Sequence, residues 1–123
     1  MSIAHPIKLR EIAVTLRAPD PSWSVRISRI VRVGEELRVV ARLARKDAGL
    51  APAMIVTIAD RLTIRLPEMK VRLFVLRQSW TWSDPDGPTS IDAMSPAARE
   101  AFELDLTGGE TWLSIPDEAG ATG

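Results

Sequence analysis

Apolar and polar residues alternate with a period of two through much of the first 76 residues, and this alternation constrains the fold more than any other feature. The clearest segments are Ile12–Leu16, Leu37–Leu43 and Leu62–Leu66, in which every second residue is apolar. Successive side chains of an extended strand point to opposite faces, so the pattern is typical of strands with one buried face. The β-branched residues repeat at two rather than at 3.6, which argues against helices in this part of the chain.

Further segments follow the same rule with local interruptions. Trp23–Val33 is a predicted strand in which Arg29 and Ile30 break the alternation as a pair, which indicates a bulge. Ile7 and Leu9 have the opposite parity to the strand that follows them, so a second bulge is predicted at Arg10-Glu11. These interruptions leave the strand assignments in place and predict irregular pairing at two points.

The remaining segments are a turn and two further strands. Gly34-Glu35-Glu36 is typical of a tight hairpin connection. Met54–Asp60 is predicted as a short strand that ends before Leu62. Val71–Leu76 carries apolar residues on both faces, which is typical of a central strand covered on both sides.

The composition changes after Ser83, where a turn sequence and then a helix are predicted. Ser95-Pro96 has the form of an N-cap followed by proline in the first helical turn, and Gly108-Gly109 is a stop signal. A helix is therefore expected from Ala97 to about Leu104, followed by a last strand at Thr111–Ile115. Five or six strands at roughly ten-residue spacing predict a mainly β fold, an antiparallel β-sandwich or barrel with a short C-terminal helix.

One domain is expected over residues 1–116, with residues 84–116 as an acidic extension and residues 117–123 as a disordered tail. The length of 123 residues fits a single domain. No apolar run approaches the ~20 residues of a membrane span, and Lys8, Arg10 and Glu11 interrupt the N-terminal stretch, so no signal peptide is expected. The interpretation is a cytoplasmic protein, with an exported mature form left open.

The sequence contains few of the residues and motifs that enzymes use for catalysis. There is no cysteine, and His5 is the one histidine; neither a phosphate-binding glycine loop nor a nucleophile elbow occurs. We therefore predict no catalytic residue, no metal and no cofactor. A carboxylate-dependent enzyme using Asp84, Asp86 and Asp92 stays open as an alternative, although acidic residues on a turn are usually solvated.

The zero net charge hides a division of the chain into a basic and an acidic part. Residues 1–77 hold 15 basic and 7 acidic residues, and residues 78–123 hold 1 basic and 9 acidic residues. Thirteen of the 16 basic residues are arginine, whose planar guanidinium suits carboxylates and phosphates. This asymmetry indicates interaction surfaces rather than a fold.

Seven arginines alternate with the apolar residues of their own strands and therefore point to the opposite side. They would all lie on one outer face if those strands shared a sheet. Three interpretations remain open: an ordinary solvated face, an internal partner in the acidic C-terminal segment, or an external anionic partner. The seven are Arg26, Arg32, Arg38, Arg42, Arg61, Arg65 and Arg72.

Two of the four tryptophans stand in a polar stretch. Trp80 and Trp82 are separated by Thr81 and flanked by Ser79 and Ser83. Tryptophan is most often a core anchor, and it is also enriched at binding hot spots. Trp80 and Trp82 are therefore candidates for contact with a partner.

The stretch Trp23-Ser24-Val25-Arg26-Ile27, Val33–Val39, Ala51-Pro52, Thr57 and Ile64–Pro67 resembles the C-terminal β domain of the PrcB-type protease-complex subunits. The shared features are an aromatic opening, a glycine-turn hairpin, a proline-bearing loop and a threonine-containing strand, over residues 22–67. The Gly-Gly-Tyr opening and the Thr-x-Pro-Tyr segment of that family are absent. The resemblance implies a non-catalytic accessory or inhibitor-like domain that contacts a larger protein, and an exported setting for its relatives.

These observations favour a non-enzymatic protein-binding module, an accessory or regulatory subunit whose protein partner is unidentified. The predicted contact residues are the seven arginines together with Trp80 and Trp82. An anion- or nucleic-acid-binding domain is the alternative, disfavoured by zero net charge and only three lysines. A homo-oligomer could form by edge-strand pairing through a strand such as Met54–Asp60.

Overall fold

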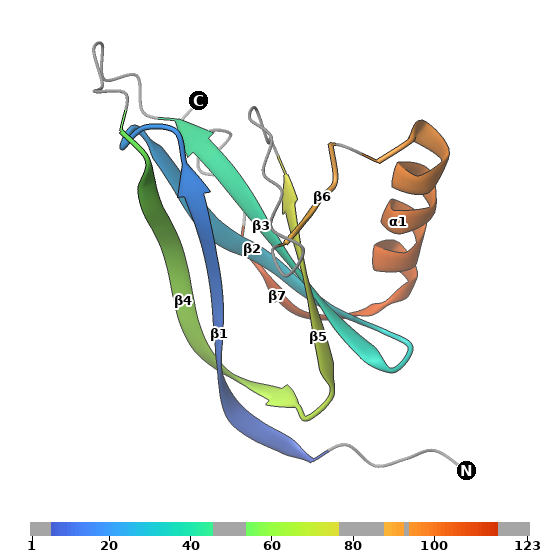
Figure 1. The fold of residues 1–123 in the computed structure, drawn as a ribbon. Helices are drawn as coiled ribbons and strands as arrows, with labels where there is room; N and C mark the ends of the chain where they lie inside the picture. Colours follow the sequence, from blue (N-terminus) through green and yellow to red (C-terminus); the bar gives the residue numbers. More distant parts are fainter. Residues whose placement is uncertain (1–5, 46–53, 77–87, 93, 116–123) are drawn as a thin grey trace.

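A computed structural model describes residues 6–45, 54–76, 88–92 and 94–115, which form two β-sheets and one helix (Figure 1). The mainly β, sandwich-like packing confirms the predicted fold class, and the sheets do not close into a barrel. One sheet has the order β1-β4 and the other the order β6-β5-β3-β2-β7. The elements are β1 (Ile7–Ala18), β2 (Trp23–Val33), β3 (Glu36–Arg45), β4 (Val56–Pro67), β5 (Lys70–Leu76), β6 (Thr89–Ser90), α1 (Pro96–Gly108) and β7 (Glu110–Ser114).

The two-stranded sheet is longer and more regular than the sequence indicates. β1 and β4 pair antiparallel over twelve positions, from Ile7↔Pro67 to Ala18↔Val56, with no shift of register. The bulge predicted at Arg10-Glu11 is therefore wrong, and Ile7 and Leu9 instead point to solvent with 53% and 69% exposure. A ladder without a bulge keeps every odd-numbered residue of β1 on one face.

A single strand also replaces the two segments predicted on either side of Asp60. The Asp60 carboxylate accepts a hydrogen bond of 2.7 Å from the backbone N–H of Ile27 on β2. Asp60 has the same parity as Ile58 and Leu62, which pack against the core. A polar residue at an inward position is thus paired instead of ending the strand.

The β2–β3 hairpin follows the sequence prediction closely. Gly34 has φ of +61° in the connection between Val33 and Glu36, a conformation that glycine adopts without steric cost. The register of the hairpin shifts between Ile27 and Arg29, which confirms the bulge expected from the broken alternation. Because Ser28 is the extra residue, the parity of β2 reverses beyond it.

The pairing of β5 differs from the expectation. β5 lies parallel to β3, with Glu36↔Lys70 through Arg42↔Leu76 in register, and β6 continues parallel to β5. Short connections and a period of two predict antiparallel pairing throughout, but the intervening β4 belongs to the other sheet. The chain therefore returns to the five-stranded sheet in the same direction as β3. β5 is an interior strand, as its apolar residues on both faces predict.

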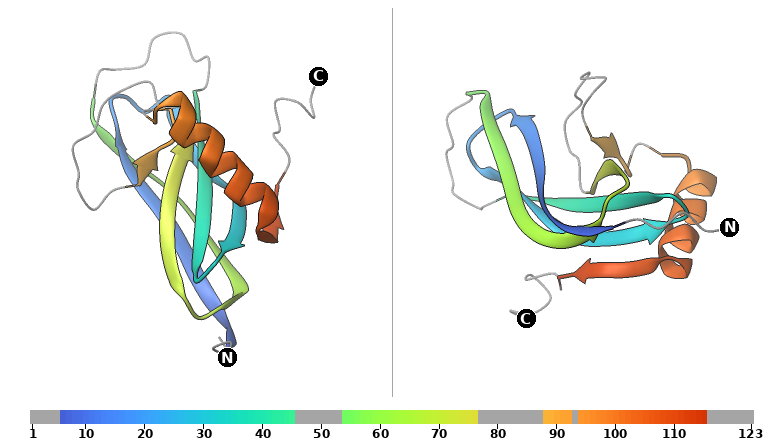
Figure 2. Two further views of the ribbon diagram at one scale, coloured as in Figure 1. Left: turned by 90° about the vertical axis from the view of Figure 1, so that its right-hand side faces the viewer. Right: turned by 90° about the horizontal axis from the view of Figure 1, so that it is seen from below.

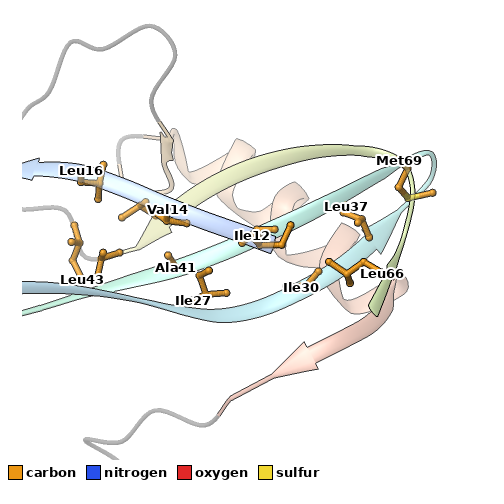
Figure 3. Packing of buried hydrophobic residues seen from close by; sticks show 13 residues of the cluster. Ile12, Val14, Leu16, Ile27, Ile30, Leu37, Ala41, Leu43, Leu66 and Met69 are labelled. Carbon is orange, nitrogen blue, oxygen red and sulfur yellow. The ribbon is translucent and has the colours of Figure 1, made fainter. Parts of the chain in front are cut away.

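The two faces of the five-stranded sheet are covered by different partners. One face packs against β1 and β4, where Val14, Ile27, Leu37 and Leu66 are fully buried (Figure 3). The other face packs against α1, whose Phe102 and Leu106 join a second buried cluster. Viewed with the helix in front, the layers are α1, then the five-stranded sheet, then the β1–β4 sheet (Figure 2, left). The cluster under α1 consists of Val31, Val40, Phe74, Ile91, Phe102 and Leu106.

Local signals place both ends of α1. The Ser95 hydroxyl accepts a hydrogen bond of 3.1 Å from the backbone N–H of Ala98, with Pro96 as the first helical residue. At the other end the backbone N–H of Gly109 donates to the Leu106 carbonyl at 3.2 Å. The predicted cap and stop are confirmed, and the helix extends to Gly108.

Replacing Gly109 by alanine is expected to destabilise the protein by about 1–3 kcal/mol, the usual cost of overpacking. A Cβ there would lie 2.5 Å from the Arg32 carbonyl oxygen and 2.6 Å from a Val31 methyl. Gly108→Ala is the matched control, because a Cβ at that position meets nothing within 4 Å. Urea unfolding of both variants measures the difference, and equal stability of the two would contradict the close approach of Gly109 to β2.

The corner between β1 and β2 is held by Asp20. Its carboxylate accepts hydrogen bonds from the hydroxyl and the backbone N–H of Ser22, the latter at 2.8 Å, and lies 3.7 Å from Arg45. The Ser22 hydroxyl foremost, then the Ser22 N–H and the Arg45 charge, hold the pKa of Asp20 below its usual value of 3.8. Each of these interactions favours the charged carboxylate.

The stability that Asp20 contributes is therefore present above pH 3.8 and is lost as the pH falls through its lower, folded-state pKa. We expect Asp20→Ala to be less stable than the parent at neutral pH, with a difference that shrinks in acid. Urea unfolding between neutral and strongly acidic pH tests this. A constant Asp20→Ala deficit at every pH would refute the expectation.

Candidate functional site

The seven arginines of the predicted contact surface do not share one sheet. Those of β2, β3 and β5 belong to the five-stranded sheet, whereas Arg61 and Arg65 lie on β4 of the other sheet. The premise of a single arginine face is therefore wrong, because alternation within a strand specifies a face but not the sheet to which the strand belongs.

Four of the seven lie on the helix-side face, by which we mean the face of the five-stranded sheet that α1 covers. Arg38 and Arg42 alternate with Val40, and Arg72 alternates with Phe74; both Val40 and Phe74 belong to the cluster under α1. Arg26 is opposite Arg42 in the β2–β3 ladder, and residues directly opposite share a face.

Arg32 departs from this group because of the bulge at Ser28. It is opposite Leu37, which belongs to the cluster between the two sheets. Its Nε donates to the Gly34 carbonyl at 3.3 Å. Arg32 therefore lies on the other face of the sheet from Arg26 and supports the hairpin turn.

Arg38 is the centre of a charge cluster beneath α1. Its guanidinium donates to Asp105 Oδ2 of the helix at 3.2 Å and lies 3.4 Å from Glu36 Oε1. It also lies 5.5 Å from the centroid of the Phe102 ring, within the range of a cation–π contact. Its side chain is only 13% exposed. A buried charge of this kind must be paired, and Arg38 is paired from both the sheet and the helix.

The other cations of this face also have partners within the chain. Arg72 lies 3.6 Å from Glu36 and 5.2 Å from the Phe74 ring centroid, and Arg29 lies 3.8 Å from Glu103 of α1. Arg26 and Arg42 interact with other groups of the chain as well. The acidic helix thus packs on the helix-side face. For Arg38, the interpretation that the arginines pair with the acidic C-terminal segment of the same chain is therefore the one that applies.

Arg61 and Arg65 are placed differently. Both are exposed on the face of the β1–β4 sheet that points away from the core, here called the outer face. In the cross-strand register Arg61 is opposite Ala13 and Arg65 is opposite Leu9. Within the described part of the chain neither guanidinium has a hydrogen bond or ion pair, although Lys8, Arg29, Arg38, Arg45, Arg72 and Arg99 all do.

Several predicted residues lie outside the described residues. These are the candidate contacts Trp80 and Trp82, the histidine His5, and the turn carboxylates Asp84 and Asp86. Asp92 is described; it is exposed and lies 3.8 Å from Arg99. Over residues 6–45, 54–76, 88–92 and 94–115, no three His, Cys, Asp or Glu side chains gather in a way that could hold a metal ion.

Sequence reasoning missed the carboxylates that complete the charge cluster. Glu36 was assigned to a turn, and Asp105 and Glu103 were placed only in a generally acidic segment. The signal that could have found them is helical spacing, because Phe102 and Asp105 stand three apart and therefore face the sheet together.

Arg17 and Glu11, exposed on the outer face, were missed because that strand was judged by its apolar residues alone.

Comparisons with known proteins do not extend this description. No family model, curated protein or solved structure matches the chain. No helix in the described residues has the length and apolar character needed to cross a membrane.

The charge cluster is expected to hold α1 on the sheet. Arg38→Met keeps most of the side-chain volume but removes the cation that Glu36 and the helix residue Asp105 share, and leaves Arg72 as the cation near Glu36. We expect a loss of about 1.5–3 kcal/mol in the free energy of unfolding, the usual contribution of hydrogen bonds to charged groups. Arg61→Met is the control and should change stability by less than about 0.5 kcal/mol, as is usual for exposed positions. Equal urea midpoints for the two variants would show that the ion pairs do not stabilise this packing.

Proposed function

We propose that this chain is a non-enzymatic protein-binding module, an accessory or regulatory subunit that contacts a larger protein through arginines of the outer face. The observation that carries the proposal is the contrast between the two sheets. Arg38, Arg72 and their neighbours are engaged within the fold, whereas Arg61 and Arg65 are exposed with no acidic partner in the described residues. Guanidinium groups left in this state are suited to bind carboxylates from outside.

The neighbours of Arg61 on β4 favour a flat and close contact. Thr57, Ala59 and Thr63, which share its face, are all small. Leu9, opposite Arg65 on β1, is exposed and adds apolar surface beside it. Arg61 and Arg65 stand four residues apart, about 13 Å along a strand. Acidic groups on the surface of a partner protein can match two cations at this separation without penetrating the sheet.

A protein partner fits this face better than nucleic acid. Single-stranded nucleic acids are usually held by aromatic side chains that stack on the bases. The described residues of the outer face carry no aromatic side chain, and the chain has zero net charge. Trp80 and Trp82 remain predicted contacts of the same partner, in keeping with the accessory role that the resemblance to PrcB-type subunits implies.

The proposal predicts that Arg61→Glu/Arg65→Glu will lose the partner. Affinity capture with the full chain, followed by titration of the captured protein, should show binding weakened by at least about tenfold, because two attractive contacts become repulsive. Raising the salt concentration should weaken the parental complex in the same direction, since exposed charges are screened.

Lys70→Glu provides the control for the single variant Arg61→Glu, which should also weaken binding. Lys70 is exposed on β5, and its replacement makes the same change in net charge on a different strand. It should leave binding unchanged. Loss of binding in Lys70→Glu to the same extent, or tight salt-dependent binding of single-stranded DNA that Arg61→Glu/Arg65→Glu abolishes, would overturn the proposal.

A further inference from the structure

β1 is an edge strand along its whole length in the described part of the molecule. Across all twelve of its positions it pairs with β4, and those two strands form a sheet of their own (Figure 1). In any strand, backbone N–H and C=O groups point alternately to the two sides. The side of β1 away from β4 therefore presents unpaired backbone groups to any strand that can reach it, as far as the described residues show.

The central part of β1 lacks the features that usually block such an edge. Natural edge strands are protected by proline, by charged side chains, above all lysine, or by a bulge. Pro6 and Pro19 flank β1, and Lys8 lies near its start, but Ile12–Leu16 contains no proline and no charge, and its ladder with β4 has no register shift. The segment is also strongly apolar on its inward side, where Ile12, Val14 and Leu16 are buried.

The charges of this segment match those of a second, antiparallel copy of itself. If two β1 strands pair about a twofold axis at Val14, Glu11 of each copy is opposite Arg17 of the other. Ile12 is then opposite Leu16 on the inward side, and Ala13 is opposite Thr15 on the outward side. Glu11 and Arg17 are exposed on the outer face, where opposite charges on facing positions stabilise a strand pair.

Glu11 is opposite Arg17 in only one register of the two β1 strands. A shift that keeps each residue on its own face moves the facing position by two residues. Glu11 then faces Thr15 in one direction and Pro19 in the other, and Pro19 has no backbone N–H to donate. Arg17 interacts with another group in its own chain, and its guanidinium has five donors, so it can bind Glu11 of the second copy as well.

We infer that two copies of this chain associate through antiparallel pairing of their β1 strands centred on Val14, forming a continuous four-stranded sheet. The sequence prediction of edge pairing named Met54–Asp60, most of which belongs to β4. We place the pairing on β1 instead, because the charges of its segment Glu11–Arg17 match those of a second copy. The inference uses the edge of β1 and not Arg61 or Arg65, so it stands or falls independently of the proposed function.

Two charge reversals of the full chain test the register. Glu11→Arg places two arginines opposite each other at both ends of the paired segment, and Arg17→Glu places two glutamates there. Each variant alone should dimerise at least about tenfold more weakly than the parent. An equimolar mixture should recover dimers that contain one copy of each variant, because every facing pair is then Arg against Glu. The double variant Glu11→Arg/Arg17→Glu should dimerise by itself.

Sedimentation velocity over a range of concentrations measures the dimer, and native mass spectrometry of a mixture with one isotope-labelled variant identifies its composition. Thermal unfolding of each variant confirms that the fold is retained. Lys70→Glu, a charge reversal on β5 outside the paired segment, should dimerise like the parent. A parent that is monomeric at every concentration, dimers that persist in both single variants, or a mixture that pairs no better than its components would each overturn the inference.

Discussion

Both faces of the five-stranded sheet must be covered, and the rest of the architecture depends on this requirement. β3 and β5 bury apolar residues on each side, with Val39 and Val75 toward the β1–β4 sheet and Val40 and Phe74 toward α1. The helix-side face also carries arginines, so an apolar helix alone could not cover it without burying unpaired charge. α1 supplies Asp105 to Arg38 together with its aromatic and aliphatic contacts. The acidic final third of the chain thus neutralises part of the basic first two-thirds within the fold.

Local features of this fold were predictable because they depend on neighbouring residues. The Ser95 cap, the Gly34 turn and the bulge in β2 each depend on a few adjacent side chains and the backbone geometry that they favour. The pairing of β3 with β5 does not depend on neighbouring residues in this way. It occurs because β4, which lies between them in the sequence, belongs to the other sheet. Periodicity carries no information about that step. Arg38 and Arg61 both alternate with apolar residues of their own strands, yet they lie in different sheets. Arg38 is ion-paired to the helix, whereas Arg61 is exposed.

Asp60 illustrates how a tertiary contact can reverse the meaning of a residue in the sequence. In isolation, a carboxylate in an apolar alternation indicates the end of a strand. In the structure the Asp60 carboxylate accepts a hydrogen bond from the backbone N–H of Ile27. Ile27 lies in the part of β2 that β7 does not reach, since the β2–β7 pairing begins at Arg29. The side chain of Asp60 takes the place of a neighbouring strand there and links the two sheets. The sequence contains no signal for this contact, because Ile27 and Asp60 are 33 residues apart.

The edge of β1 and the arginines of β4 belong to one two-stranded sheet, and this proximity relates the two proposals. Pairing about an axis at Val14 keeps each outer face on the same side of the enlarged sheet, since Glu11, Ala13, Thr15 and Arg17 all stay on it. A dimer of this kind would present Arg61 and Arg65 twice on one continuous surface. A partner with acidic groups on two subunits could then bind both copies at once, and the second contact would form at a high effective concentration. Weak individual ion pairs at exposed arginines would in that case be sufficient for a stable complex.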